Sequence, residues 1–217
     1  MRLVRMWLAV GFASLCSLPV HAAMVSYFLD RSNELIDGPN YLRVDIQDAG
    51  ADIRFTVTLL APLLSIAPAS GSGFGMQSFG FNIAGNGTLN PSVNIAGLPT
   101  GWSAQVNPSG NLDGFGKFEL VADTTGQFRQ SPTLTFYIVG IAGDTPSTYV
   151  AYSNGGNPQY FASHVAGFLP QSKGSGTATS AYFAGSMAAA VVPLPAAGWL
   201  LLSGIVGVGG LVRRRRS

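Results

Sequence analysis

Apolar and polar residues alternate along two neighbouring segments in the first third of the chain. The segments are Tyr41 to Asp48 and Ile53 to Leu59, and every second residue in each is apolar. Alternation with a period of two is typical of a β-strand that has one buried face. The four residues between the segments, 49–52, form a loop of hairpin length. The pattern therefore predicts an antiparallel hairpin with one face on a core and the other in solvent.

Short segments of the same character follow, separated by clusters of Gly, Asn, Pro and Ser. They predict strands at 77–83, 102–106, 117–122, 133–141, 149–152, 160–166 and 179–184. Many short strands at this spacing indicate an all-β domain, an antiparallel β-sandwich or jelly roll, over residues 23–184. Residues 170–176 are predicted to be a flexible loop and residues 185–191 a linker.

The first 22 residues have the pattern of a secretory signal peptide. Arg2 and Arg5 precede an almost wholly apolar stretch, Met6 to Leu18, that is about as long as the hydrophobic region of such a peptide. The stretch is short for a membrane span, which needs roughly 20 apolar residues. Small residues at −3 and −1 place the predicted cleavage site after Ala22. A leucine precedes Cys16, which argues against a lipoprotein signal.

The end of the chain, residues 192–217, has a three-part pattern of prolines, an apolar stretch without charge, and arginines. As a helix, the apolar stretch 196–212 would be about 26 Å long, close to the thickness of a hydrocarbon core. Arginines stay on the cytoplasmic side of a membrane, so the body of the protein is predicted on the opposite side. A cleaved signal peptide predicts the same topology. The cluster consists of Arg213, Arg214, Arg215 and Arg216.

This tail resembles the PEP-CTERM sorting signal in its VPLPA variant. The resemblance rests on Val192, Pro193, Leu194, Pro195, Ala196 and Ala197, then on Trp199 to Gly204 and the arginine cluster. It covers only about residues 191–217, and Leu194 stands where the family usually has glutamate. The resemblance implies export through the inner membrane, recognition of the tail by a membrane-embedded exosortase, and removal of the helix. It also implies an association with an exopolysaccharide matrix.

Other interpretations of the tail share part of this pattern. Leu194 to Gly198 is similar to a sortase LPxTG motif with Ala197 in place of threonine, but it runs into the apolar stretch without a spacer. A GPI signal normally ends in its hydrophobic segment, whereas this chain ends in arginines. An ordinary single-pass anchor is the simplest alternative. Ser203 and Gly207 form a small-residue pair that suits either an exosortase contact or a helix dimer.

Charge and cysteine content change the picture of the body. The chain has twelve Lys and Arg against ten Asp and Glu, but six of the basic residues lie in the two ends. The body therefore carries six basic and ten acidic residues, a net charge of −4. No basic patch remains to attract nucleic acid. Because Cys16 is the only cysteine, the mature body would have neither a disulfide nor a thiol nucleophile.

Candidate chemical groups are few in the body. His164 is its only histidine, and the chain has no Gly-x-Ser-x-Gly elbow and no His-Glu-x-x-His motif. His164 is therefore predicted to be structural, and no cofactor is expected. The densest carboxylates, Asp45, Asp48 and Asp52, flank the first hairpin turn and offer oxygen ligands that suit calcium, although their spacing does not match an EF-hand. Solvated turn residues are the simpler interpretation of these three.

The sequence thus predicts a non-enzymatic surface or matrix protein, delivered by its C-terminal tail. The alternative is a carbohydrate-binding module, which would need a row of exposed aromatic rings. The candidate rings are Trp102, Tyr137, Tyr149, Tyr152 and Tyr160. A second aromatic group, predicted to be core rather than sugar-binding surface, consists of Phe74, Phe79, Phe81 and Phe115. A third alternative, a hydrolase, would need an acidic pair facing one cleft.

Overall fold

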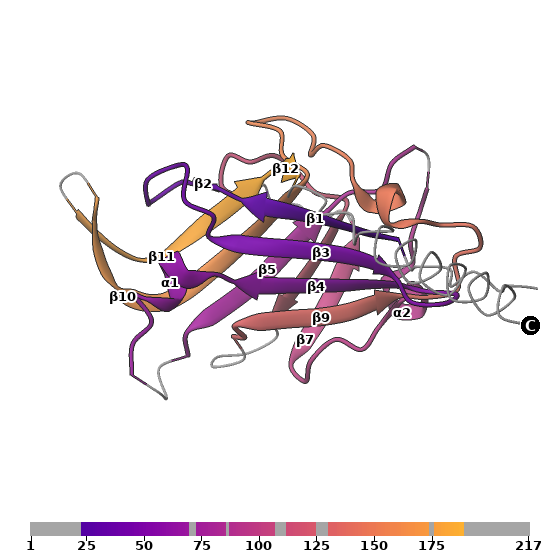
Figure 1. The fold of residues 1–217 in the computed structure, drawn as a ribbon, viewed down its shortest axis with the longest axis horizontal. Coiled ribbons are helices and arrows are strands. Elements are labelled where there is room, and N and C mark those ends of the chain that lie inside the picture. The colour runs from indigo at the N-terminus through magenta and orange to yellow at the C-terminus, as the bar shows by residue number, and fades with distance from the viewer. Residues whose placement is uncertain are drawn as a thin grey trace, which may run out of the picture.

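The computed structural model describes residues 23–69, 73–85, 87–106, 112–124, 130–173 and 176–188. Within these ranges the chain forms two six-stranded antiparallel sheets packed face to face (Figure 1). The predicted all-β sandwich is therefore confirmed. The predicted signal peptide, 1–22, and sorting tail, 192–217, lie outside the described residues. No helix in the described part of the chain is long and apolar enough to cross a bilayer.

The first sheet contains the predicted hairpin at its centre. Its strands, in spatial order, are β12 (Met187–Ala188), β1 (Met24–Leu29), β3 (Leu42–Asp48), β4 (Ile53–Leu59), β9 (Thr133–Ile138) and β6 (Ile95–Ala96). The hairpin β3–β4 pairs in continuous register from Leu42 opposite Leu59 to Asp48 opposite Ile53. Alternate side chains of both strands are buried, as the sequence pattern predicts.

The second sheet faces the first across the core. Its strands, in spatial order, are β2 (Arg31–Ser32), β11 (Gly176–Gly185), β10 (Phe161–Lys173), β5 (Gly75–Phe81), β8 (Leu120–Thr124) and β7 (Trp102–Val106). Three short helices lie in the connections: α1 (Ala61–Leu64), α2 (Pro91–Asn94) and the 3₁₀ helix η1 (Pro146–Tyr149).

Aromatic rings from both sheets meet in the core. The ring of Phe55 stacks on Phe136 with centroids 4.8 Å apart, and it also contacts Phe79 and Phe81 from the opposite sheet. Each fully buried ring of this size contributes about 1.5–3 kcal/mol through removal of apolar surface from water. The prediction that Phe79 and Phe81 are core residues is confirmed. Phe115 is also buried, but it packs outside the second sheet.

Two strand pairs join the sheets along one side of the sandwich. The chain passes from the first sheet to the second between β1 and β2, and it returns between β11 and β12. These four strands lie together at the upper side of the sandwich in Figure 1. Gly185 lies at the second crossing, where a Cβ atom would come 2.1 Å from the carbonyl oxygen of Phe28. Only glycine allows so close an approach of two backbones.

This crossing corrects the start of the predicted linker 185–191, because Gly185, Met187 and Ala188 belong to the sheets. Gly185 is the last residue of β11, and Met187 and Ala188 form β12. The predicted loop 170–176 is also largely strand: β10 continues to Lys173 and β11 begins at Gly176. A bulge separates this extension from the rest of β10, and Gly167 there has a φ of +79°.

The predicted strand 149–152 is wrong, because the helix η1 ends at Tyr149 and residues 150–152 belong to no helix or strand. Thr145 caps the helix: its backbone N–H donates to the hydroxyl of Thr148 at 3.0 Å, and Pro146 occupies the first turn. A capping residue followed by proline favours a helical start over an extended strand. The predicted strand 117–122 is shifted, since β8 begins at Leu120 and Lys117 makes only an isolated bridge with Asn154.

Candidate functional site

A row of polar side chains crosses the outer face of the second sheet. Strand register pairs Asp123 with both Ser103 and Ser78, and pairs His164 with both Ser78 and Tyr182. Directly paired residues point to the same face of a sheet, so the five side chains form one line across β7, β8, β5, β10 and β11. We call these five residues the polar row.

The next row along the strands shows which face this is. It contains Ala184, Ala162, Gly80 and Val121, and the loop 112–118 covers it with Leu112, Phe115 and Phe118. The small residues make room for the loop, because a Cβ on Gly80 would lie 2.7 Å from Cδ1 of Leu112. The polar row is therefore the first row beyond the edge of this apolar cover.

The rings of His164 and Tyr182 form a stacked pair at the end of the polar row. Their centroids are 4.4 Å apart and their planes are inclined by 23°. Both side chains are half-buried, as is Asp123. Burial lowers the pKa of His164 below its usual 6.5, although Asp123 and Asp113 oppose the shift. The imidazole is therefore neutral at pH 7, with one nitrogen able to donate and the other able to accept a hydrogen bond.

Asn33 connects the loop 112–118 to the strand that carries Tyr182. Its side-chain carbonyl accepts the backbone N–H of Tyr182 at 2.8 Å, and its own backbone N–H donates to the Tyr182 carbonyl at 3.2 Å. Its side-chain amide also donates to the carboxylate of Asp113. Asp113 has a φ of +39°, in the left-handed region that residues other than glycine rarely adopt. These contacts place a second carboxylate next to the ring pair.

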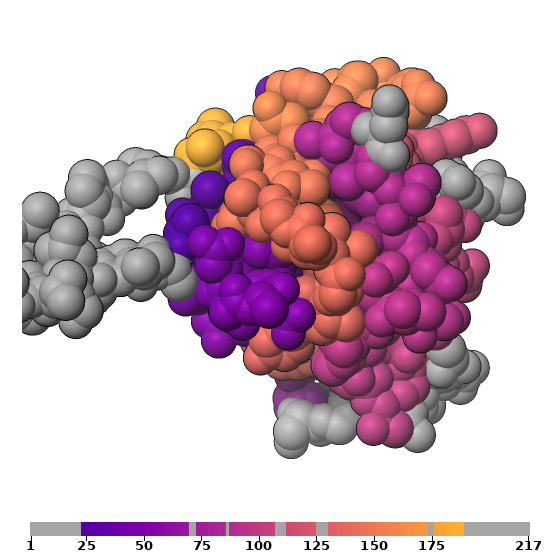
Figure 2. Space-filling model, turned by 90° about the vertical axis from the view of Figure 1, so that its right-hand side faces the viewer, coloured from indigo at the N-terminus to yellow at the C-terminus, as the bar shows by residue number. Residues whose placement is uncertain are grey.

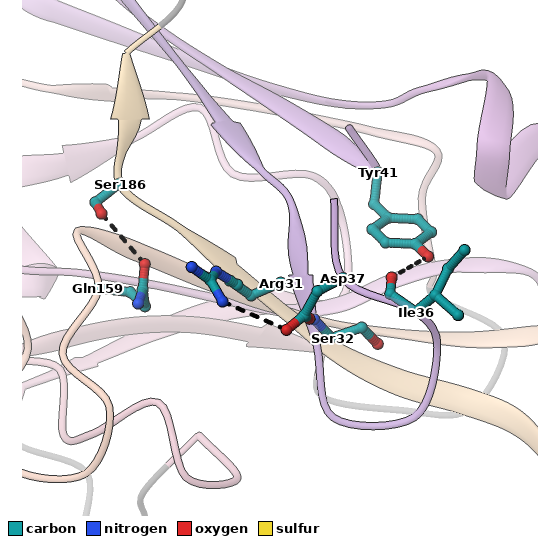
Figure 3. Close-up of polar contacts among 7 residues, drawn as sticks. All are labelled: Arg31, Ser32, Ile36, Asp37, Tyr41, Gln159 and Ser186. Atoms are coloured by element: carbon teal, nitrogen blue, oxygen red, sulfur yellow. Dashed lines mark hydrogen bonds and ion pairs between the residues drawn. The ribbon is translucent and has the colours of Figure 1, made fainter. Parts of the chain in front are cut away.

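The connection that carries Asn33 is held by a compact set of polar contacts (Figure 3). Arg31 pairs with the carboxylate of Asp37 at 3.4 Å, and that carboxylate also accepts the backbone N–H of Ser32 at 2.9 Å. The hydroxyl of Tyr41 donates to the carbonyl of Ile36 at 2.7 Å. Because these contacts order both sides of the connection, Asn33 is positioned by the fold and does not depend on a ligand.

Two predicted aromatic candidates form a separate group at one end of the sandwich. The rings of Tyr152 and Tyr160 lie with centroids 4.3 Å apart, and Tyr160 contacts Tyr27 edge-on at 5.5 Å. Tyr152 is 59 % exposed. Tyr152 precedes and Tyr160 adjoins the start of β10, in the connection that Figure 2 shows in orange across the end of the sandwich. This group lies beside the exit of the described chain, since Tyr27 pairs with Ala188.

The remaining candidate rings do not extend this group into an exposed row. Trp102 and Tyr149 are core residues, so they cannot belong to the exposed row that a carbohydrate-binding module would need. The hydroxyl of the fully buried Tyr149 donates to Asp144 at 2.5 Å, and burial together with this contact raises its pKa. Tyr137 is half-buried and lies on the first sheet.

The candidate calcium ligands Asp45 and Asp48 make hydrogen bonds to different protein groups. Asp45 accepts hydrogen bonds from the hydroxyl of Ser26 at 2.5 Å and from Nε of Arg43 at 2.8 Å. Asp48 accepts the backbone N–H of Ala23 at 2.9 Å. Within the described ranges, no three His, Cys, Asp or Glu side chains lie close enough together to hold a metal ion. The structure therefore does not assemble Asp45, Asp48 and Asp52 into a site.

A small open cavity lies near one end of β5, between the two outer strands β7 and β8 and the segment after β5. Its volume is about 100 Å³, and it is lined by Ile83, Gly87, Thr88, Leu89, Val106, Glu119 and Leu120. Glu119 is the only ionisable group in this lining, and its carboxylate already accepts the N–H of Ile83 at 2.9 Å. The cavity therefore offers no pair of groups for acid–base chemistry.

No family model, curated protein or solved structure matches this chain. Function must therefore be inferred from its own residues. The sequence identified His164 but missed its neighbours Tyr182, Asp123 and Asn33. The alternation in the predicted strands 160–166 and 179–184 could have suggested a hairpin partner for His164. Nothing in the sequence, however, specifies which residue lies opposite it.

Proposed function

We propose that this chain is an exported, non-enzymatic bacterial surface or matrix protein whose β-sandwich is delivered by its C-terminal tail. The order of residues in that tail carries the proposal: Val192 to Ala197, then the apolar stretch 196–212, then Arg213 to Arg216. An apolar segment of this length suits a bilayer, and the arginines suit its cytoplasmic side. Recognition and removal of the tail by an exosortase then follow from the resemblance to the VPLPA-type signal.

The arrangement of the sandwich is compatible with delivery by both ends of the chain. β1 begins at Met24, directly after the predicted cleavage region, and β12 ends at Ala188, shortly before Val192. Because β12 runs antiparallel to β1, the chain leaves Ala188 toward the end of the sandwich at which β1 begins (Figure 1). Both export segments would therefore attach at the same end of the sandwich, which leaves the opposite end free of them.

The tail would hold the sandwich near the membrane until it is removed. Seven residues, 189–195, separate Ala188 from the start of the apolar stretch. Fully extended, this separation is at most about 27 Å, at about 3.4 Å per residue. A domain tethered this closely cannot move far from the bilayer, so release into a surrounding matrix, including exopolysaccharide, would require cleavage.

Fractionation of producing cells tests this proposal. In the double variant Pro193→Ala, Pro195→Ala, the rigid motif is lost while the apolar stretch and the arginines are kept. We expect the native protein outside the membrane fraction and shortened at its C-terminus, and the variant in the membrane fraction at full length. Pro170→Ala, outside the tail, is the matched control and should behave as the native protein does. Release of the double variant at the native rate would rule out the motif as the sorting signal.

A second arm separates an exosortase substrate from an ordinary anchor. Deleting the exosortase gene of the producing cell should leave the native protein uncut in the membrane fraction. A native protein that keeps its arginines in unmodified cells would instead be a simple single-pass protein.

A further inference from the structure

We propose that the polar row is a binding site for neutral sugar residues of a polysaccharide. In this site the His164–Tyr182 pair is the apolar contact surface, and the carboxylate of Asp123 accepts hydrogen bonds from sugar hydroxyls. The proposal concerns the folded body alone and does not depend on how the tail is processed.

The position of the row makes it accessible from the outer face. The loop 112–118 covers the row of small residues beside it, and of the polar row only Tyr182 packs against this apolar cluster. Ser103, Asp123, His164 and Tyr182 are all half-buried, so each keeps part of its surface in solvent. Ser78 is more deeply buried and forms the floor between Asp123 and His164.

The ring pair has unused hydrogen-bonding capacity. Within the described residues, neither the imidazole nitrogens of His164 nor the hydroxyl of Tyr182 makes a hydrogen bond to another residue. These unpaired atoms are not buried. In the described part of the chain, the one buried side-chain nitrogen or oxygen without a hydrogen bond is Oε1 of Gln130. The polar atoms of the pair therefore face solvent, where a ligand can reach them.

A sugar matches this combination of groups. The apolar C–H face of a sugar ring packs against an aromatic ring, while its hydroxyls donate to carboxylates and accept from N–H and O–H groups. Sites for such ligands combine apolar surface with a few fixed polar groups, as the polar row does. Asn33 and Asp113 add a preformed carboxylate beside Tyr182.

Charge selects a neutral ligand over an acidic one. The polar row contains no Lys or Arg, and the carboxylates of Asp123 and Asp113 both influence the ring pair electrostatically. With His164 neutral, these carboxylates leave a negative potential at the site, which repels uronic acids and phosphates. The row crosses five strands at about 4.8 Å each, so its length of about 19 Å exceeds that of one sugar ring.

Hydrolysis is a less suitable function for the same residues. Ser78, His164 and Asp123 are the residue types of a nucleophilic triad, which requires a direct hydrogen bond between the acid and the base. Asp123 and His164 stand on strands separated by β5, so their backbones are about 9.6 Å apart. The buried Ser78 lies between them. The arrangement therefore supports binding rather than proton transfer.

Affinity electrophoresis of the full-length protein in mild detergent tests the site. The gels contain a neutral β-glucan, a neutral mannan, or acidic alginate as a negative control. We expect retardation by at least one neutral polysaccharide and none by alginate. Tyr182→Ala and Asp123→Asn should each weaken binding by about tenfold or more, as expected for loss of a contact to a charged group or an aromatic surface.

Matched variants separate binding from folding. Asp123→Asn keeps an oxygen that can accept the N–H of Thr124, as Asp123 does at 2.7 Å, so this variant should melt like the native protein. Tyr137→Ala removes a half-buried ring from the first sheet and should bind normally. The proposal is overturned if no neutral polysaccharide is retained, if alginate binds more tightly, or if folded Asp123→Asn binds as the native protein does. Loss of binding on Tyr152→Ala alone would overturn it and would place the binding site at the rings of Tyr152 and Tyr160 instead.

Discussion

Replacing Gly185 by alanine should disrupt the crossing between the two sheets. The new Cβ would lie 2.1 Å from the carbonyl oxygen of Phe28 and 2.8 Å from Cα of Leu29. Both neighbours are backbone atoms of β1, so no side-chain rotation can relieve the contact. The strands must separate by about 1 Å, which weakens the pairing of β12 with β1 and of Gly185 with Phe161.

The expected loss of stability follows from these contacts. Overpacking a tightly packed site costs about 1–3 kcal/mol or more, and lost backbone hydrogen bonds add about 1 kcal/mol each. Alanine recovers only about 0.4–1 kcal/mol by restricting the unfolded chain. We therefore expect a net loss of about 3 kcal/mol, which lowers the melting temperature of a domain of this size by about 6–12 °C.

Thermal unfolding followed by circular dichroism measures this loss. Gly50→Ala is the matched control, because Gly50 has a φ of +84° but no atom within 4 Å of the position that a Cβ would occupy. Its cost should be only the strain of a left-handed alanine, about 1–2 kcal/mol. Equal melting temperatures for Gly185→Ala and Gly50→Ala would show that β11 and β1 do not approach each other as described.

Three other substitutions probe particular contacts. Tyr149→Phe should cost about 1–3 kcal/mol, because it removes the hydroxyl that donates to Asp144 from a fully buried ring; chemical denaturation measures it. Burial lowers the pKa of His164 in the folded protein. Below about pH 6.5 the unfolded chain therefore binds more protons than the folded protein, so the free energy of unfolding decreases as the pH falls. His164→Gln should flatten this part of the stability profile, measured as melting temperature between about pH 7 and pH 5. In a protein cleaved after Ala22, the nitrogen of Ala23 becomes an ammonium group 2.9 Å from Asp48. Asp48→Asn should then lower the free energy of unfolding by about 0.5–1 kcal/mol, and added salt should reduce the difference.

Each of these substitutions has a result that contradicts its premise. Tyr137→Phe is the control for Tyr149→Phe, and equal losses would argue against the buried contact. A pH profile that His164→Gln leaves unchanged would show that His164 does not titrate differently on folding. Asp52→Asn is the control for Asp48→Asn, since the Ala23 nitrogen donates to Asp48 and not to Asp52. Equal losses in the two variants would contradict the pairing of Ala23 with Asp48.

The sequence predicts those parts of the fold that local patterns determine. Residues 41–48 and 53–59 alternate and are joined by the short loop 49–52, so both strands and their pairing follow from the pattern. The strand predicted at 149–152 failed because the capping Thr145 and Pro146 outweigh β propensity there. The sequence did not predict β12, because a strand of only two residues shows no periodicity and forms through its pairing with β1.

The candidate site depends on information that a single sequence lacks. His164 is visible as the only histidine of the body, but the polar row exists only through the register of five strands. A shift of one residue in any strand would turn its side chain to the other face. The aromatic candidates show the same limit, because alternation does not reveal that Trp102 points into the core while Tyr152 lies at the surface. Partners far apart in the sequence therefore had to come from the structure.

The intact mass of the protein recovered from producing cells tests the proposed delivery most directly. Cleavage after Ala22 and removal of the tail predict a species that begins at Ala23 and lacks the apolar stretch 196–212 and the arginines Arg213 to Arg216. Tandem mass spectrometry of the terminal peptides identifies both ends. A surface-located protein whose mass includes Arg213 to Arg216 would contradict processing of the tail, and one that still begins at Met1 would contradict export by a cleaved signal peptide.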